Sequence, residues 1–423
     1  MALTFFLMLS MIGALLESAS IHIEKNCKRA DTRLALESVF AEYHQTLLEQ
    51  YDVFARLGCD EETLKGRLSY YGVGDMEHSV EEIQLLTDEK GNPFYKQAVQ
   101  EAKSWLGLNE FSFGENYVFE MGESLKQEEN QIWRKMEDAI NKVGESIDWS
   151  SHPLGAILNL KKGDLITLLI ANPGELSQKS IQTDKLPSKR TLEKGNYKEA
   201  QKDGIVDKAF FVFYLTEHFK DRTNIDENRS LSYEIEYLLG GEHTDRENLS
   251  KVCEKLLQIR MVANYVYLLT DSAKTTEAKS VATGLTTIIA LPEIEPVVEQ
   301  AILFAWAYGE SVVDVRGLLK GNRIPLIKTA DSWQLQLSNL ATLGTKDEIS
   351  GEKNIAEGLQ YKDYLIGLLL LEGKDALCMR ALDLIESNLK IETDRCMTKV
   401  EIKSRASLRR GIQETFTTKY GYQ

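Results

Sequence analysis

The stretch Leu3 to Leu16, LTFFLMLSMIGALL, decides the organisation of this 423-residue chain. Its fourteen residues carry no charge, whereas a helix that crosses a bilayer needs about 20 apolar residues. Extending the run through Ala19 places Glu17 at the membrane interface, where a long side chain can reach the headgroups. We therefore predict a membrane anchor over residues 1–20 that contacts the lipid bilayer through residues 3–19.

Two other interpretations of this segment stay open. A signal peptide would be cleaved near Ser18, Ala19 and Ser20, which are small as such sites require, but no basic residue precedes the apolar run. The third possibility is a helix buried in a protein core, because a run of this length also occurs there.

Apolar residues continue at helical spacing beyond the anchor. Their gaps of one, three and four residues trace a single stripe on a helix. The stripe consists of Leu36, Val39, Phe40, Tyr43, Leu47, Tyr51, Phe54 and Leu57. No Pro or Gly occurs between Gly13 and Gly58. We predict one continuous helix from Leu3 to Leu57, roughly 80 Å long at about 1.5 Å per residue, with two helices separated near Asn26 as the alternative.

The charges beside the anchor bear on its orientation. Lys25, Lys28, Arg29 and Arg33 follow the apolar run, and no basic residue precedes it. Basic residues beside a span are retained in the cytoplasm, so this distribution predicts a cytoplasmic location for the rest of the chain.

The composition of the whole chain excludes several classes of protein. Hydrophobic residues make up 43% and charged residues 27%, which is typical of a globular protein rather than a disordered one. The formal charge of −15 makes nucleic acid or an anionic membrane surface a poor partner for the body as a whole. The five cysteines are widely spaced and form no CxxC pair, so a disulfide framework or a zinc site is not expected, although a single bridge is compatible with the spacing.

The remaining chain predicts a mainly α-helical protein. We expect an N-terminal helical region over 21–174 that includes the long helix, and a helical domain over 204–397. Residues 175–203 are polar and contain Pro187, so they form either a linker between domains or a surface loop within one continuous domain. Alternation in Val400–Lys403 and Thr415–Thr418 predicts short β-strands within 398–423, in a small sheet that an earlier segment completes.

Helical spacing predicts several individual helices, some with assigned features. We expect Trp105 and Trp133 to anchor helices 94–108 and 115–143 in the core, and Asp245 or Asn248 to cap the helix that ends at Leu269. Further helices are predicted over Asp207–Lys220, Leu303–Tyr308 (a core helix), Tyr364–Leu371 and Ala376–Leu389.

No motif that carries known chemistry occurs in the chain. The six histidines form no HExxH pair, Lys320 lacks the rest of a phosphate-binding loop, and no GxGxxG or GxSxG is found. The carboxylate pairs Glu234/Glu236 and Glu293/Glu295 could each supply a general acid and a general base, but a spacing of two points side chains apart on a helix. We therefore interpret them as a solvated acidic face. We predict no catalytic, cofactor-binding or metal-binding residues and no small-molecule substrate.

Several long stretches resemble one family. They are Thr4–Ala19, Leu34–Phe54, Asn172–Arg190, Leu231–Leu249 and Leu303–Leu340. Together they resemble an uncharacterised domain family of Gram-positive anaerobes, named as a domain of unknown function. Its genes lie beside Tad/Flp-type pilus genes, and its anchor is similar to that of TadE-like minor pilins. The resemblance implies a single-pass membrane protein whose N-terminus is inside the cell and whose soluble domain is extracytoplasmic.

The resemblance and the empty search for chemistry lead to three functional hypotheses. The first is a non-enzymatic envelope protein that belongs to a Tad/Flp-like pilus or secretion apparatus, as a minor pilin or an assembly scaffold. Its partners would be the bilayer and other pilus or envelope proteins, and not nucleic acid. The second is a surface-exposed binding module independent of any pilus. The third is an enzyme with an unrecognised site.

Overall fold

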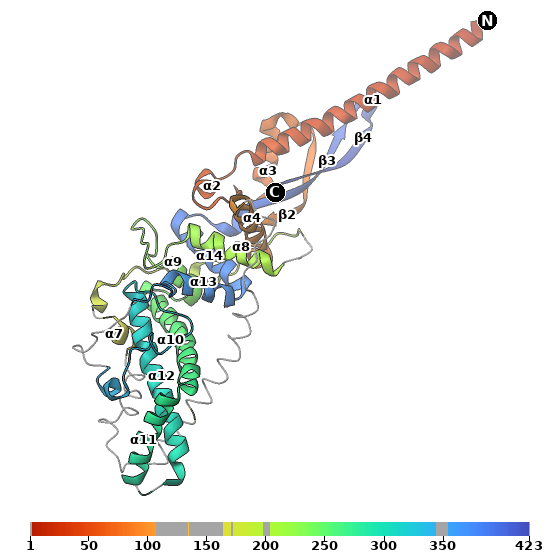
Figure 1. The fold of residues 1–423 in the computed structure, drawn as a ribbon. Coiled ribbons are helices and arrows are strands. Elements are labelled where there is room, and N and C mark those ends of the chain that lie inside the picture. The colour runs from red at the N-terminus through yellow and green to blue at the C-terminus, as the bar shows by residue number, and fades with distance from the viewer. Residues whose placement is uncertain are drawn as a thin grey trace. The chain divides into compact units, whose positions relative to one another are not determined.

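The structure is a computed structural model that describes residues 2–106, 134, 164–170, 172–197, 204–288, 290, 292–343 and 354–422. The chain divides into two compact units, each assembled from separate stretches of sequence. Unit 1 contains residues 1–109, 183–214 and 374–423, and thus joins the red and blue ends of the chain in Figure 1. Unit 2 contains residues 110–182 and 215–373.

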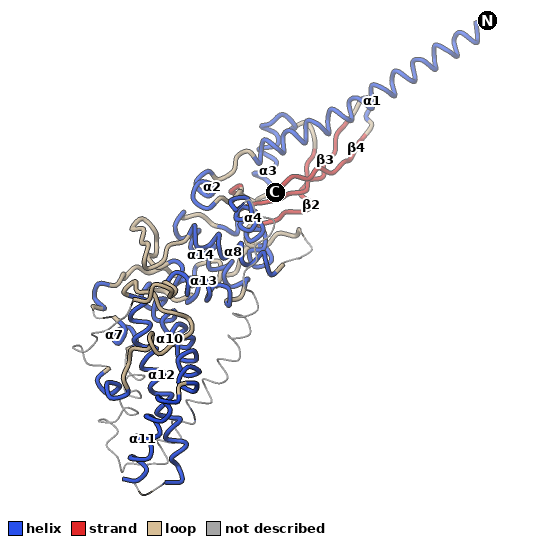
Figure 2. The backbone as a smooth tube through the Cα atoms, in the orientation of Figure 1, coloured by secondary structure: helices blue, strands red, loops and turns tan. Residues whose placement is uncertain are grey.

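Unit 1 begins with the single helix α1, Ala2–Phe40, seen in Figure 2 as one unbroken helix. The predicted continuous helix is therefore wrong beyond Phe40, and the alternative break near Asn26 is wrong as well. The chain turns at 41–44 and enters α2, Gln45–Tyr51, where Nδ1 of His44 accepts a hydrogen bond from the backbone N–H of Leu47 at 3.1 Å. The apolar spacing continues across the turn because α1 and α2 both bury their apolar sides in unit 1.

Unit 1 contains an antiparallel sheet of four strands: β1 (Arg56–Leu57), β2 (Glu77–Leu85), β3 (Cys396–Ser407) and β4 (Gln413–Gly421). The long strand β3 lies in the centre, with β2 along one edge and β4 and then β1 along the other. The C-terminal strands are thus confirmed, and β1 and β2 are the earlier segments that complete the sheet.

The C-terminal part of α1 packs against this sheet. Ala35, Leu36, Val39 and Phe40 share a buried core with β3, where inward-facing Val400, Ile402 and Ala406 alternate with more exposed residues. Further elements of unit 1 are α3 (Glu61–Leu68), the short helix η1 (Ser69–Val73), α4 (Asp88–Leu106), most of α8 (Ile205–His218) and α14 (Lys374–Leu389). Figure 1 shows α1 lying along the β3–β4 hairpin.

The predicted anchor Trp105 lies near the end of α4 and stacks on Tyr214 of α8, with ring centroids 6.1 Å apart. Its side chain remains 39% exposed, so it is a peripheral contact rather than a core residue. Trp133 lies outside the described residues.

Unit 2 is built around the helix α12, Glu295–Leu319, in which every residue from Ala301 to Leu318 is buried. The predicted core helix at Leu303–Tyr308 is therefore confirmed as part of a longer one. Its neighbours are α10 (Asp245–Thr270) and α11 (Ser272–Ile288). The unit also contains α7 (Leu165–Leu169), α9 (Glu234–Gly240), α13 (Tyr361–Leu371) and the 3-10 turn η7 (Leu337–Thr342).

The N-terminus of α10 differs from the prediction. Its cap is Thr244, which forms a reciprocal capping box with Glu247, and not Asp245 or Asn248. Those two residues are fully buried instead. Asp245 accepts backbone hydrogen bonds from Ser232 and Tyr233, so its carboxylate fixes the entry to α9.

The polar segment 175–203 contains the point, at Thr183, where the chain passes from unit 2 to unit 1. Its described residues contain the end of a short 3-10 turn, Pro173–Glu175, a second one, Thr183–Lys185, and an isolated antiparallel bridge between Ser180 and Thr244. In the part that belongs to unit 1, Arg190 pairs with Glu386 and, at 2.5 Å, with Asp394. In the part that belongs to unit 2, Ser177 Oγ donates to Asp245 at 2.6 Å.

Candidate functional site

The first functional feature is the N-terminal part of α1. Every large apolar side chain between Leu3 and Leu16 is at least half exposed, from 54% at Ile12 to 76% at Leu3. A helix that is apolar all round is stable only inside a core or in a membrane. Among the described residues, this is the single helix long and apolar enough to cross a bilayer, in the N-terminal position that signal sequences also occupy. The predicted anchor is confirmed as a candidate membrane span.

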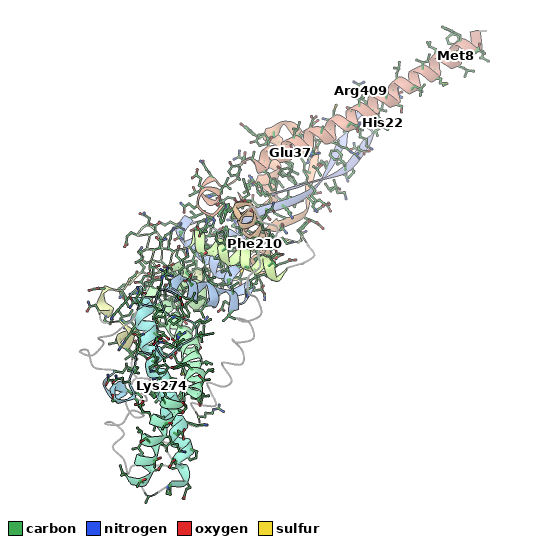
Figure 3. The ribbon with its side chains drawn as sticks, in the orientation of Figure 1. Met8, His22, Glu37, Phe210, Lys274 and Arg409 are labelled. Atoms are coloured by element: carbon green, nitrogen blue, oxygen red, sulfur yellow. The ribbon has the colours of Figure 1, made fainter. Side chains whose placement is uncertain are left out.

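The turn of the β3–β4 hairpin lies beside α1 where the apolar run ends. Arg410 Nε is 2.5 Å from a carboxylate oxygen of Glu17, the first charged residue after the run. Arg409 donates through its backbone N–H to Glu24 at 3.1 Å and through Nη1 to Ser20 Oγ at 2.8 Å. Figure 3 shows Arg409 next to this part of α1, between the labelled residues Met8 and Glu37.

The basic residues that follow the anchor also have acidic partners. Lys25 and Arg29 both pair with Glu414 of β4, and Lys28 pairs with Asp75. These contacts join α1 to β4 and to the turn before β2, between the apolar run and the core residues of the same helix. Since α1 continues unbroken through both, the candidate span and the folded unit form one helical connection without a hinge.

The second feature is a cluster of charges in the core of unit 2. Arg260 of α10, Glu310 and Asp314 of α12, and Lys328 in the segment after α12 are each no more than 3% exposed. Two acids and two bases make the cluster neutral. Buried charges are tolerated only when they are paired and hydrogen-bonded, so the contacts of each decide what the cluster does.

Asp314 is the centre of this cluster. Its Oδ2 accepts from Arg260 Nε and from Asn264 Nδ2, both at 3.0 Å, and its Oδ1 accepts from Lys328 Nζ at 2.7 Å. Arg260 also donates through Nη1 to the carbonyl oxygens of Pro325 and Leu326, at 2.9 and 2.8 Å. The central helices therefore hold the backbone of the segment that follows α12.

Glu310, one turn before Asp314, also binds the segment that follows α12. It accepts from Lys328 Nζ at 2.5 Å and from the backbone N–H groups of Gln334 and Leu335, at 3.1 and 2.7 Å. Burial raises the pKa of Glu310, while the charge of Lys328 acts in the opposite direction. These acceptors bind donors of the protein itself, so the cluster acts as an internal clamp on the segment that follows α12.

The pair Glu234/Glu236 corrects the predicted solvated face. Both side chains are 0% exposed. Glu234 accepts from the backbone N–H of Lys220 at 2.9 Å, and Glu236 accepts from that of Arg222 at 3.1 Å. The two carboxylates therefore bind backbone N–H groups two residues apart in the segment that follows α8, a tertiary contact that helical periodicity does not reveal. The other pair behaves differently, because Glu293 is exposed and Glu295 is partly exposed.

Glu236 makes the stability of unit 2 sensitive to pH. Burial, and then the charge of Asp221, raises its pKa from 4.5 to about 8. Between these values the folded state binds a proton that the unfolded state releases. The resulting stabilisation is fully present below pH 4.5 and is lost as the pH rises through 8.

We expect the free energy of unfolding to fall by on the order of 3 kcal/mol between pH 5 and pH 8, and the variant Glu236→Gln to remove most of this slope. Glutamine keeps Oε1 as an acceptor for Arg222 and for the hydroxyl of Tyr361, which lies at 2.9 Å. Urea unfolding at several pH values measures the slope. Glu254→Gln, at a half-exposed position of α10, is the control and should retain it; an equal slope in both variants would contradict the assignment.

The histidines and cysteines form no metal site among the described residues. His78, for example, bonds Ser404 Oγ at 2.9 Å and the carbonyl oxygen of Val73 at 3.0 Å. All five cysteines are free, so the compatible single bridge is not formed.

Sequence reasoning missed the clamp in unit 2. Its local signal is present, because Glu310 and Asp314 interrupt an apolar helix four residues apart and therefore lie on one face of it. Their partners Arg260 and Lys328 come from other segments and have no fixed spacing to them.

The model of a family of unknown function, DUF5702, matches residues 144–408. The expected resemblance to an uncharacterised domain family is confirmed to this extent. The matched region includes the clamp and β3, and the stretches at 4–19 and 34–54 lie outside it. No curated protein and no solved structure matches the chain.

Proposed function

We propose the following for this chain, which belongs to the DUF5702 family of unknown function: it is a non-enzymatic protein of the cell envelope, anchored by α1 as a single-pass membrane protein. Its folded units lie on the extracytoplasmic side, as the sequence resemblance implies. The observation that carries the proposal is the apolar run of α1, exposed on all sides and continuous with a helix that is packed into unit 1.

The contacts at the end of this run favour a retained anchor over a cleaved signal. The small residues Ser18–Ser20 lie in the middle of α1 rather than in an extended segment. Glu17 and Ser20, on either side of the expected cleavage point, both bind the β3–β4 turn. Cleavage there would remove the partner of Arg410.

The clamp in unit 2 supports a structural role for the body. Four charged side chains in its core bind one another and neighbouring backbone groups. Such an arrangement fixes one conformation of the segment that follows α12. Its polar groups are already hydrogen-bonded within the protein, whereas catalysis requires polar groups that can contact a substrate.

The resemblance extends the proposal to a Tad/Flp-like pilus or secretion apparatus, in which the chain serves as a minor pilin or assembly scaffold. Glu17 lies at the far end of the apolar run and is paired with Arg410, so it is unlike the glutamate near the N-terminus of polymerising pilins. This favours an accessory component. Co-purification with pilus proteins would support this role, and its absence would favour an independent surface-binding module.

The exposed thiol of Cys27 provides a test of anchor and orientation in cells that express the full chain. It lies eleven residues beyond Leu16, about 16 Å along the helix, and therefore outside a headgroup layer of about 5–8 Å. We expect a membrane-impermeant maleimide to label the protein in intact cells, and the protein to remain in the membrane fraction. The variant Cys27→Ser should lose most of the label.

The remaining cysteines should contribute little to this signal. Burial, and then the hydrogen bond to Glu193, raises the pKa of Cys59 to about 11, which suppresses its reactive thiolate. The other three cysteines are buried. Labelling only after lysis would place the body in the cytoplasm, as the basic residues after the anchor predict. Release of a chain that lacks its first 18–20 residues would establish a cleaved signal.

A further inference from the structure

We propose that the β3–β4 turn, Leu408–Ile412, is a second membrane contact, which binds the headgroups of anionic phospholipids beside the α1 span. This inference rests on the anchor proposed above. It is independent of the side of the membrane on which unit 1 lies.

The turn lies at the depth of the headgroups. Its contacts with α1 are made by Glu17, Ser20 and Glu24, and Glu17 directly follows the last residue of the apolar run. At about 1.5 Å per residue these positions lie roughly 1.5–12 Å beyond the run. The headgroup region adds about 5–8 Å on each side of the hydrocarbon core. A span that ends at Leu16 therefore brings Arg410 to the phosphate layer.

The charge of this end of the molecule is opposite to that of the chain. Residues 17–33 and 405–414, taken together with residues 75–77 that pair with them, carry seven basic and six acidic side chains, a surplus of one positive charge, whereas the whole chain carries −15. Basic residues clustered next to a span are attracted to anionic lipids. The prediction that an anionic membrane surface is a poor partner concerns the body as a whole, and this turn would be a local exception to it.

The two arginines remain accessible although they are paired. Their side chains are 71% exposed at Arg409 and 74% exposed at Arg410. Arg410 contacts Glu17 through Nε, and a guanidinium has four further N–H donors in a planar arrangement that suits phosphate. Ile412 is 43% exposed beside them, so the turn combines cationic and apolar side chains as membrane-interface segments do.

The backbone gives independent support. Arg410 has φ = +60°, a left-handed conformation that Gly or Asn adopts more readily than a long side chain, and it precedes Gly411 at φ = +74°. The strain of such a conformation in a long side chain persists only where a stabilising interaction offsets it. Contact with phosphate supplies one.

The test uses the full chain with Cys27→Ser and Cys59→Ser, and with Ile412→Cys carrying an environment-sensitive fluorophore. The protein is reconstituted into vesicles of phosphatidylcholine and phosphatidylglycerol in a 7:3 ratio. Quenching of the probe is compared between nitroxides on the headgroups of the two lipids. One basic residue at an anionic surface gives up to about a fivefold preference. Because both arginines are paired with acids, we expect quenching by the phosphatidylglycerol nitroxide to be about two to five times stronger than quenching by the phosphatidylcholine nitroxide; this factor is the quenching ratio.

Arg410→Gly is the decisive variant, since glycine adopts the same φ without strain and keeps the turn folded. It should bring the quenching ratio close to one, as should Arg409→Gln. Arg405→Gln, on β3 with its side chain 61% exposed, removes the same charge away from the turn and should leave the ratio unchanged.

The outcomes separate this inference from the anchor. If the chain floats with the vesicles and Arg410→Gly abolishes the lipid preference, the inference is supported. If the chain floats but the ratio is one, or survives in both turn variants, the turn does not bind anionic lipid and the anchor stands. If the chain does not float with the vesicles, both proposals are overturned.

Discussion

Replacement of Asp314 by alanine is expected to lower the free energy of unfolding of unit 2 by about 3–5 kcal/mol. The variant leaves Arg260 and Lys328 in the core with one carboxylate fewer, and the positive charges that remain are 0% exposed. Removing one partner of a buried ion pair lowers the free energy of unfolding by more than the intact pair contributes, because the other partner stays buried without a counter-charge. Hydrogen exchange of the α12 amides in the detergent-solubilised full chain measures the effect.

Lys251→Ala provides the matched control for this experiment. Lys251 lies on α10, as Arg260 does, and its ion pair with Glu254 is about half exposed. An exposed pair contributes little, so the variant should change the stability by less than about 0.5 kcal/mol. A loss below about 1 kcal/mol in Asp314→Ala would show that the clamp does not hold unit 2 together.

The double replacement Leu9→Arg and Ile12→Arg should release the chain from membranes. Each arginine near the middle of a span raises the apparent free energy of insertion by about 2.5–3.5 kcal/mol, so the two together exceed the gain from a marginally short apolar run. Both side chains are already more than half exposed, so unit 1 should fold normally. The measurement is the fraction of protein that remains in the membrane pellet after alkaline carbonate extraction.

Leu34→Arg is the control for the span. Leu34 is 62% exposed on the same helix, but it lies well beyond the apolar run, next to the part of α1 that packs on the sheet. This variant should stay in the pellet as the unchanged chain does. If the double variant also stays there, the N-terminal run is not the membrane anchor.

Local patterns predicted most of the elements of this fold. The spacing of apolar residues placed α13 and α14 around Gly373, and alternation placed β3 and β4 at the C-terminus. Prediction was poorer where a helix ends without Pro or Gly. The apolar stripe runs past Phe40 because the next helix, α2, buries its side chains in the same unit, so periodicity alone gave no sign of the turn.

The candidate sites also differ in whether they depend on consecutive residues or on residues far apart in the sequence. The apolar run of α1 is a property of consecutive residues and was found directly. The clamp of unit 2 and the burial of Glu234 and Glu236 depend on pairs that are separated by 14–54 residues. The residues next to a carboxylate in the sequence are the same whether the carboxylate contacts water or a distant part of the chain. For this reason the pair Glu234/Glu236 was wrongly predicted to be solvated.

The sequence by itself determined the mainly helical class, the candidate membrane helix and the β-strands at the C-terminus, because each follows from the order of polar and apolar residues within one segment. Only the tertiary structure decided where α1 ends, which segments complete the sheet and which charges are buried. It also brought Arg409 and Arg410 next to Glu17 and Ser20, nearly 400 positions earlier in the chain. Such contacts form when distant segments pack, and their energy depends on burial and on partners that no local pattern specifies.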